Sequence, residues 1–337
     1  MPYFGYESIG GAEISNLNYI HELNEYEHVV ITNHFSSKPG LGEFEGVKFY
    51  NLHDDQILKC ILNESPDLII CTHELVVFPF NLDIPYIIYL HDPRSGCSNL
   101  LTNDCNLDCK NCSIFNLHES FYMPFEKAHK IICCSKYLID VSSKQIKQNI
   151  HDVPVYPNIR LSKLTNKINP RIIGLTSVAR HKGSDILEHL LTLFPDYKFI
   201  ICGSNKLNKK FQNIEYIGCL NYDDIYTKFY SKIGTYVSTA INGEAFGMTI
   251  VEAFSSGIPV LFPYSDGLIE SSGFDWFSIP YSNRNCISTW SKYLYDIVEN
   301  NSIRDAMIKE SSLVTQRYKQ MKYDSLSVLR ELISNLS

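Results

Sequence analysis

Short apolar runs alternate along the chain with longer segments of mixed polarity. In the first half, apolar runs at 28–32, 67–71, 85–90 and 130–134 predict buried strands. The segments between and around them predict helices at 11–24, 54–63 and 136–148, and Ser135 is a residue type that caps a helix start. Strands that alternate with helices predict an α/β fold with parallel sheets.

A second series of the same kind follows residues 154–170, which contain three prolines and no clear period and therefore predict a linker. After it, strands are expected at 171–176, 197–202, 214–217, 234–238 and 258–262. Helices are expected at 184–194, 222–231 (capped by Asn221), 249–256, 287–300, 302–318 and 322–335.

The two series predict two doubly wound, Rossmann-like domains. The expected boundaries are 1–160 for the first domain and 161–318 for the second, with 319–337 crossing back to the first. Sheets of this type bind ligands at the carboxyl ends of their strands, so two of them facing each other would form a cleft.

Composition narrows the function classes. The chain has 337 residues, of which 45% are hydrophobic and 20% charged, which is ordinary for a globular protein. The net charge of −7 argues against a nucleic-acid partner, because such proteins usually carry a basic face. The first residues lack a charged start and an apolar core, so no export signal is expected and a cytoplasmic location is predicted.

The most informative segment is 243–263, where a glycine-containing loop leads into a helix and then into a buried strand. Amides at the start of such a helix bind phosphate oxygens, and glycine lets the backbone approach a ligand closely. The expected contacts are Phe246, Gly247, Met248 and Thr249. Glu252 would reach a ribose diol and Glu244 a sugar hydroxyl, because ionised carboxylates accept hydrogen bonds from hydroxyls. For a bare pair of glutamates, a solvated loop acid and a helix acid are the favoured interpretation.

The residues around the pair distinguish these interpretations. The run E-A-F-G-M-T-I-V-E-A-F-S-S-G-I-P-V closely resembles the E-x7-E signature of glycosyltransferase family 4, whose members are retaining enzymes with the GT-B fold. The resemblance implies transfer of a sugar from a nucleotide diphosphate sugar to a glycan or a lipid-linked acceptor. It also implies same-face attack with retention. No divalent-metal motif such as Asp-x-Asp stands out at the donor site, so catalysis is expected to require no metal cofactor.

Other segments extend the resemblance. Residues 177–183 are similar to the basic loop of the family, which implies that Arg180 and Lys182 neutralise the donor diphosphate. Only one residue separates these two, fewer than the family usually has, and a solvated basic turn is the alternative. The strand-end positions Gly203, Cys219 and Leu220 correspond to loops near the nucleotide.

The N-terminal half carries weaker signals. Gly10 and Gly11 resemble the glycine loop that approaches the donor, although the strand expected before them is very short. His91 ends a predicted strand where the family has a histidine that faces the donor sugar, whereas a lone histidine is more often structural.

Four cysteines fall within sixteen residues, at Cys97, Cys105, Cys109 and Cys112. A closing C-x2-C is a common half-site for zinc, and four thiolates would complete a closed, structural tetrahedron. Unrelated free thiols or a disulfide are the alternatives.

Two further functions stay open at this point. A sugar-nucleotide epimerase or phosphorylase of the same fold would need additional acid and base groups, and a non-catalytic sugar-nucleotide-binding protein would bind the donor without transfer. A lipid-linked acceptor would bring peripheral membrane contact, but the three lysines of 136–148 fit a solvated helix better. The base, the sugar, the acceptor and the oligomeric state are not predicted.

Overall fold

A computed structural model describes residues 11–32, 47–52, 54–72, 83–91, 125–144, 146, 149–162, 168–176, 178, 182–203, 207, 209–241 and 244–336. The chain divides into two compact units. Unit 1 consists of Met1–Ile159 and Met321–Ser337, and unit 2 consists of Arg160–Gln320.

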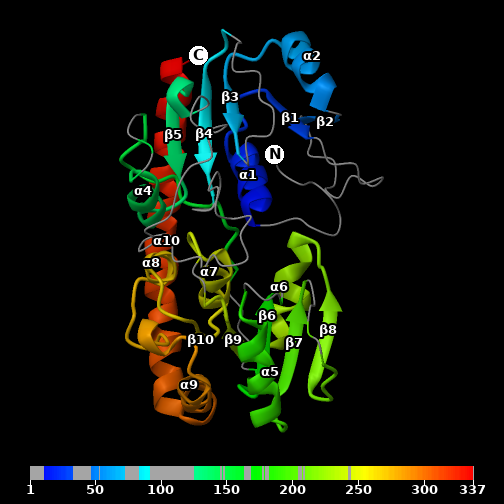
Figure 1. Cartoon of the computed structure of the whole chain (residues 1–337), viewed down its shortest axis with the longest axis vertical. Coiled ribbons are helices and arrows are strands. Elements are labelled where there is room, and N and C mark those ends of the chain that lie inside the picture. Colours follow the sequence, from blue (N-terminus) through cyan, green and yellow to red (C-terminus); the bar gives the residue numbers. More distant parts are fainter. Residues whose placement is uncertain are drawn as a thin grey trace. The chain divides into compact units, whose positions relative to one another are not determined.

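Unit 1 contains two parallel sheets. In one, β1 (His28–Thr32) pairs with β2 (Val47–Asn51); in the other the order is β3 (Ile69–Cys71), β4 (Tyr86–Leu90), β5 (Lys130–Cys133). All five residues of β4 are buried, as expected for the central strand of a parallel sheet (Figure 1). The predicted strands of the first half are confirmed within a residue or two at each end, whereas β2 was not predicted.

Three helices of unit 1 correspond to the predicted ones: α1 (Gly11–Glu22), α2 (Asp54–Glu64) and α4 (Lys136–Ser142). The predicted cap of α4 is confirmed, because the Leu138 amide donates to Ser135 Oγ over 3.0 Å. The helix ends at Ser142, so the prediction that it continues to 148 was wrong.

Unit 2 is built on one five-stranded parallel sheet, and its order is β10-β9-β6-β7-β8 (Figure 1). The strands are β6 (Ile172–Thr176), β7 (Lys198–Cys202), β8 (Ile214–Gly218), β9 (Thr235–Val237) and β10 (Val260–Leu261). The chain starts at the central strand, adds β7 and β8 on one side, and then returns to add β9 and β10 on the other. The strand order therefore reverses between β6 and β9, and ligands of such sheets bind at this switch point.

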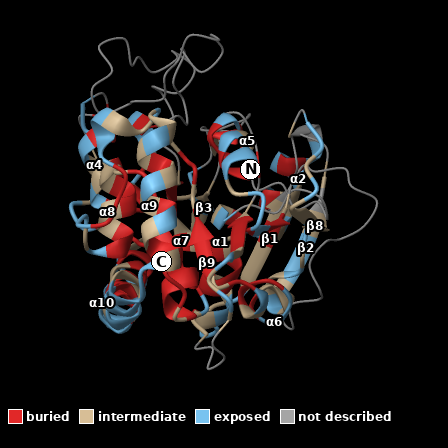
Figure 2. Ribbon diagram, turned by 90° about the horizontal axis from the view of Figure 1, so that it is seen from below, coloured by how far each residue is buried: buried red, intermediate tan, exposed pale blue. Residues whose placement is uncertain are grey.

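Four helices of unit 2 connect these strands or follow the last of them: α5 (Ser184–Leu193), α7 (Met248–Ser255), α8 (Asp266–Ser272) and α9 (Ile287–Glu299). Figure 2 shows α7 and β9 almost entirely buried. The indole of Trp290 on α9 is also fully buried, and its Nε1 donates to the Arg284 carbonyl over 2.8 Å. The buried core of unit 2 thus includes residues of β6 and β9, the strands between which the order reverses.

The predicted helix 222–231 is instead three short pieces: η3 (Tyr222–Asp224), α6 (Ile225–Lys228) and η4 (Tyr230–Lys232). Asn221 forms no side-chain capping hydrogen bond, so that prediction was wrong. The backbone leaves helical geometry at Phe229, and this residue and Tyr230 are both fully buried. Successive residues of a straight helix point about 100° apart, so a local break lets both rings enter the core.

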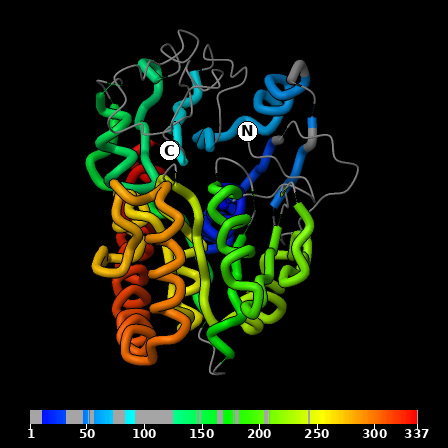
Figure 3. The backbone as a smooth tube through the Cα atoms, turned by 60° about the horizontal axis from the view of Figure 1, so that its bottom comes forward, coloured from blue at the N-terminus to red at the C-terminus, as the bar shows by residue number. Residues whose placement is uncertain are grey.

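Helix α10 (Asn301–Leu336) is a single helix of 36 residues, which Figure 3 traces as one coil from orange to red. Two helices, 302–318 and 322–335, were predicted, and the separation between them was wrong. Its residues up to Gln320 belong to unit 2 and those from Met321 belong to unit 1. Within unit 1, Ser325 Oγ accepts from the Tyr156 amide over 2.8 Å and Lys322 pairs with Glu22 over 2.5 Å.

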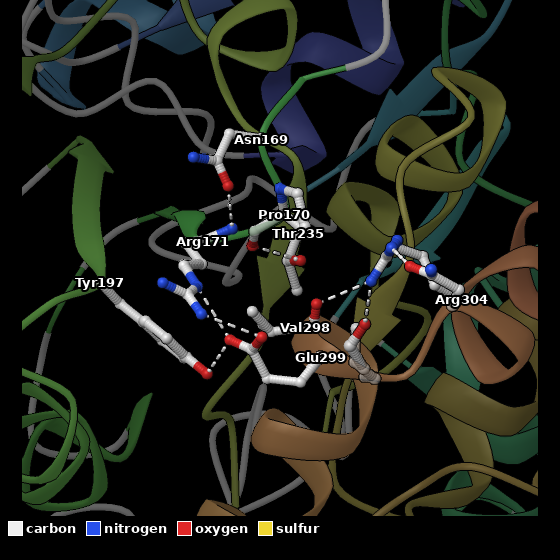
Figure 4. A network of polar contacts seen from close by, with 10 residues as sticks. Asn169, Pro170, Arg171, Tyr197, Thr235, Val298, Glu299 and Arg304 are labelled. Carbon is white, nitrogen blue, oxygen red and sulfur yellow. Dashed lines mark hydrogen bonds and ion pairs between the residues drawn. The ribbon is translucent and has the colours of Figure 1, made fainter.

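Polar contacts join the amino ends of the strands in unit 2 to the end of α9 (Figure 4). The Arg171 guanidinium donates two hydrogen bonds to the Glu299 carboxylate, over 2.9 and 3.1 Å. The Tyr197 hydroxyl donates to the same carboxylate over 2.7 Å, and Thr235 donates to the Pro170 carbonyl over 2.9 Å. This end of the sheet lies opposite the carboxyl ends of its strands, so we assign these contacts a structural role.

Among the described residues, none of the helices combines the length and the apolar character that a membrane span requires.

Candidate functional site

The loops that follow β6 and β9 meet at the switch point of the unit 2 sheet. Lys182 comes after β6 and Glu244 after β9, and Lys182 Nζ lies 2.5 Å from Glu244 Oε1. Both side chains are partly exposed, at 35% and 28%, so solvent and solutes reach the pair. Ion pairs of this exposure contribute only about 0–1 kcal/mol to stability, and the position of the pair therefore bears on binding more than on folding.

A second contact fixes the two loops to each other. Thr239 Oγ1 donates to the Lys182 carbonyl over 2.5 Å. Gly183 has a φ of +72°, and a Cβ at this position would lie 2.1 Å from the Thr239 carbonyl oxygen. Only glycine fits this backbone and this space. The glycine after Lys182 is thus explained by the close approach of the loop that follows β9.

The start of α7 lies in the same loop. Gly247 precedes the helix with a φ of +80°, and a Cβ there would lie 2.4 Å from Leu268 Cδ2 on α8. The first amides of a helix have no partner within it. Met248 and Thr249 are partly exposed, whereas Phe246 is buried with its ring 6.4 Å from that of Tyr318. Phe246 therefore has only its backbone to offer a ligand.

Glu252 lies one turn into α7 and is only 3% exposed. The Tyr230 hydroxyl donates to Glu252 Oε2 over 2.8 Å, and the Tyr222 hydroxyl forms a second hydrogen bond with the carboxylate. Burial raises the pKa of Glu252 to about 7, since the two hydrogen bonds, which act in the opposite direction, offset only part of the desolvation.

The predicted positions on β7 and β8 lie at the same edge of the sheet. Gly203 follows β7, and its amide donates to the Gly218 carbonyl at the end of β8 over 2.8 Å. Cys219 is exposed and Leu220 partly exposed, just after β8. Burial raises the pKa of the neighbouring Cys202 thiol to about 11, so this thiol is protonated at neutral pH. The structure thus gathers all the described site residues of the second half at one edge.

Sequence reasoning missed the groups that hold these residues in place: Thr239, Tyr222 and Tyr230. The tyrosines repeat at 222, 226 and 230, a spacing of four that is typical of one face of a helix. Nothing in that pattern indicates a buried carboxylate, because the partner lies on α7.

Two of the predicted residues that the structure describes belong to unit 1. Gly11 is the exposed first residue of α1, and His91 follows β4 with its ring 4.0 Å from that of Tyr89. The His91 carbonyl accepts from the Cys134 thiol over 3.6 Å. Gly10, Arg180 and the cysteines at 97, 105, 109 and 112 lie outside the described residues. Within the described part of the chain, no cluster of His, Cys, Asp or Glu forms a metal site.

Known structures share this fold. HepE from Anabaena, solved in complex with UDP and glucose, is 14% identical with a TM-score of 0.75, and the match covers 96% of each chain. A glycosyltransferase from Rickettsia africae is 15% identical with a TM-score of 0.65, covering 97% of this chain and 94% of the other.

The pneumococcal O-GlcNAc transferase GtfA, solved with UDP and GlcNAc, is 17% identical with a TM-score of 0.64. The match covers 83% of this chain but 59% of GtfA, so the chain spans about three fifths of that enzyme. At these identities the likeness concerns the fold. A comparison with curated proteins found no match.

A family model gives the more specific result. Residues 157–271 match the family described as glycosyl transferases group 1. The matched segment contains the sheet of unit 2 together with Lys182, Glu244 and Glu252. The segment that matches the glycosyl transferases group 1 model thus contains the candidate site, within a chain that has the α/β GT-B fold.

Proposed function

We propose that the chain is a glycosyltransferase that binds a nucleoside diphosphate sugar, a UDP-sugar in the first instance, in unit 2. The Lys182–Glu244 pair at the switch point carries this proposal, since it places a cation and a hydroxyl acceptor side by side within the matched domain. The structures of HepE and GtfA contain UDP, which supports the choice of base.

Lys182 has the charge that the reaction needs. A sugar leaves a nucleoside diphosphate with negative charge developing on the phosphate, and a nearby ammonium stabilises that charge. The amides at the start of α7 add donors for the same phosphates. The contact with Glu244 keeps the Lys182 ammonium at this position before the donor binds. Arg180 would add a second cation.

The carboxylates suit the two ends of the donor. Glu244 is partly exposed and would accept from a hydroxyl of the transferred sugar, while Glu252 would accept from the ribose diol. Gly203, Cys219 and Leu220 lie where backbone contacts to the base are expected. In unit 1, Gly10 and Gly11 would approach the donor, and His91 would face its sugar.

The finer assignments are also part of the proposal. The E-x7-E run favours family 4 and retention at the anomeric carbon. The acceptor is proposed to be a glycan, with a lipid-linked glycan at a membrane surface as the alternative. The cysteines at 97, 105, 109 and 112 remain candidate ligands of a structural zinc ion, since four thiolates suit a closed tetrahedral site.

The test is a screen of nucleoside diphosphate sugars for binding and for release of the nucleoside diphosphate. We expect the wild type to bind one of them and both Lys182→Gln and Glu244→Gln to lose at least tenfold in activity. Lys198→Gln is a matched control, because its ammonium pairs with Glu215 over 2.6 Å on the strands β7 and β8 of the same sheet.

Equal losses in Lys182→Gln and in the Lys198→Gln control would contradict the proposal. Product analysis separates the alternatives, because a transferase yields a new glycoside or the hydrolysed sugar. An epimerase would instead return an isomeric sugar nucleotide, and a binding protein would release no nucleoside diphosphate.

A further inference from the structure

Four tyrosines and one cysteine surround Glu252, with no basic side chain among its described partners. Desolvation and two tyrosine hydroxyls account for the state of its carboxylate. The ionisable side chains around it come from five elements: Cys202 on β7, Tyr222 on η3, Tyr226 on α6, Tyr230 on η4 and Tyr236 on β9. Their charge-free hydroxyls and thiol cannot neutralise a carboxylate as a lysine would.

Tyr230 is one of the two hydroxyls that hold this carboxylate. Its ring is completely buried, and its hydroxyl is 2.8 Å from Glu252 Oε2 but 3.4 Å from the Thr249 carbonyl. The shorter contact to a charged acceptor is the stronger one. The buried ring leaves the hydroxyl little freedom to turn elsewhere, so it fixes one oxygen of the carboxylate.

Tyr222 carries the second of these hydroxyls, and a backbone amide determines the direction of its proton. Its oxygen accepts from the Arg160 amide over 3.1 Å, which leaves its own proton for Glu252. The Arg160 guanidinium lies 5.8 Å from the centre of the Tyr222 ring and pairs with Asp223 over 2.6 Å. Its charge is therefore balanced by the Asp223 carboxylate.

We infer that Tyr230 and Tyr222 are positioning residues for nucleotide binding: their hydroxyls hold the Glu252 carboxylate in the orientation in which it accepts from the ribose diol. The inference rests on the proposed function, because it takes Glu252 as the ribose contact. When a ribose diol donates hydrogen bonds to this carboxylate, binding favours the ionised form, and the proton of protonated Glu252 is released to solvent.

The direction of this pH dependence follows from the linkage between proton binding and ligand binding. Burial has raised the pKa of Glu252 to about 7, so below neutrality the free protein must lose a proton before it binds the diol. For a ligand that requires the ionised form, affinity then rises about tenfold between about pH 6 and about pH 8 and levels off above. Loss of either tyrosine hydroxyl makes ionisation of Glu252 less favourable, so the midpoint of the curve of affinity against pH moves to higher pH.

The experiment is titration calorimetry with UDP-glucose from about pH 5.5 to about pH 9, on the full chain. UDP-glucose is the probe because both ends of its diphosphate are esterified, so the ligand itself has no phosphate that titrates near pH 6. We expect Tyr230→Phe and Tyr222→Phe to shift the midpoint upward by roughly one unit, as loss of a hydrogen bond to a charged group predicts. Glu252→Gln is expected to bind weakly and without pH dependence.

Tyr226→Phe is the matched control. Its hydroxyl donates to the Arg160 carbonyl and not to Glu252, while its ring lies 5.5 Å from that of Tyr230 in the same cluster. A general loosening of the cluster would lower affinity equally at every pH in all three variants, and this would overturn the inference. A midpoint that moves in Tyr230→Phe and Tyr222→Phe but not in Tyr226→Phe would support it.

The outcomes separate the two proposals. Binding of UDP-glucose that is equally strong at every pH would refute the role of the tyrosines and leave the transferase proposal standing. If UDP-glucose and the other nucleoside diphosphate sugars fail to bind the wild type at any pH, the proposed function fails first.

Discussion

Replacement of Glu252 by Gln is expected to stabilise unit 2 above neutral pH. The side chain is 3% exposed, and burial has raised its pKa from 4.5 to about 7. The folded protein therefore binds this proton more tightly than the unfolded chain between these two values. The corresponding stability is present below the unfolded pKa and is lost as the pH rises through about 7.

The size of the expected stability difference follows from the raised pKa of Glu252. A difference of about 2.5 pKa units corresponds to roughly 3 kcal/mol of unfavourable free energy for the ionised side chain in the folded state. Gln keeps a carbonyl oxygen that accepts from Tyr230 and removes the buried charge. Between about pH 5 and about pH 8 the variant should therefore gain roughly 2–3 kcal/mol relative to the wild type.

Urea unfolding followed by tryptophan fluorescence measures this difference. The two tryptophans, Trp276 and Trp290, both belong to unit 2, so the signal reports on the unit that contains Glu252. We expect the stability curves of the two proteins to run parallel well below pH 4.5, and the advantage of the variant to widen as the pH rises from there to about 7. A constant difference at all pH values would refute the reasoning, since it would mean that Glu252 titrates alike in both states.

Three further outcomes are expected. Gly183→Ala should weaken nucleotide-sugar binding at least tenfold in calorimetry, because its Cβ would lie 2.1 Å from the Thr239 carbonyl oxygen and separate the two loops; an unchanged affinity would contradict the close approach. Trp290→Ala should destabilise unit 2 by about 3–5 kcal/mol in a thermal or urea transition followed by circular dichroism, as for other large-to-small changes in a packed core. Mass spectrometry of the purified chain should find about one zinc ion per molecule, lost when Cys109 and Cys112 are replaced by Ser; a metal-free wild type would refute that site.

The apolar strands were predictable because parallel strands are buried on both faces and read as continuous hydrophobic runs. Strand β2 was missed for the opposite reason. Its sequence places Lys48 and Tyr50 on a face where both reach Glu64, over 3.0 and 2.5 Å, and Phe49 is 39% exposed. A polar, half-exposed strand leaves little periodic signal.

The continuity of α10 was missed because its apolar pattern weakens around Lys319 and Gln320. No glycine or proline interrupts the helix there, and the backbone continues as one helix to Leu336. Pattern alone does not separate a polar helical turn from a short loop.

The candidate site was predictable residue by residue but not as an arrangement. Lys182 and Glu244 were each assigned to a different part of the donor, and their pairing depends on the strand order that brings β6 beside β9. The buried state of Glu252 depends on tyrosines from three short helical pieces. Both are consequences of tertiary structure, which residue spacing does not record.

Helix α10 makes the order of synthesis differ from the order of completion. Residues 1–159 leave the ribosome before residues 321–337, so unit 1 lacks Ser325 and Lys322, the partners of the Tyr156 amide and Glu22, until that later segment is made. Nascent domains generally fold in order from the N-terminus. Here the early unit must wait for the tail of the chain, and a fragment cut after residue 159 would leave the buried Tyr156 amide without its acceptor.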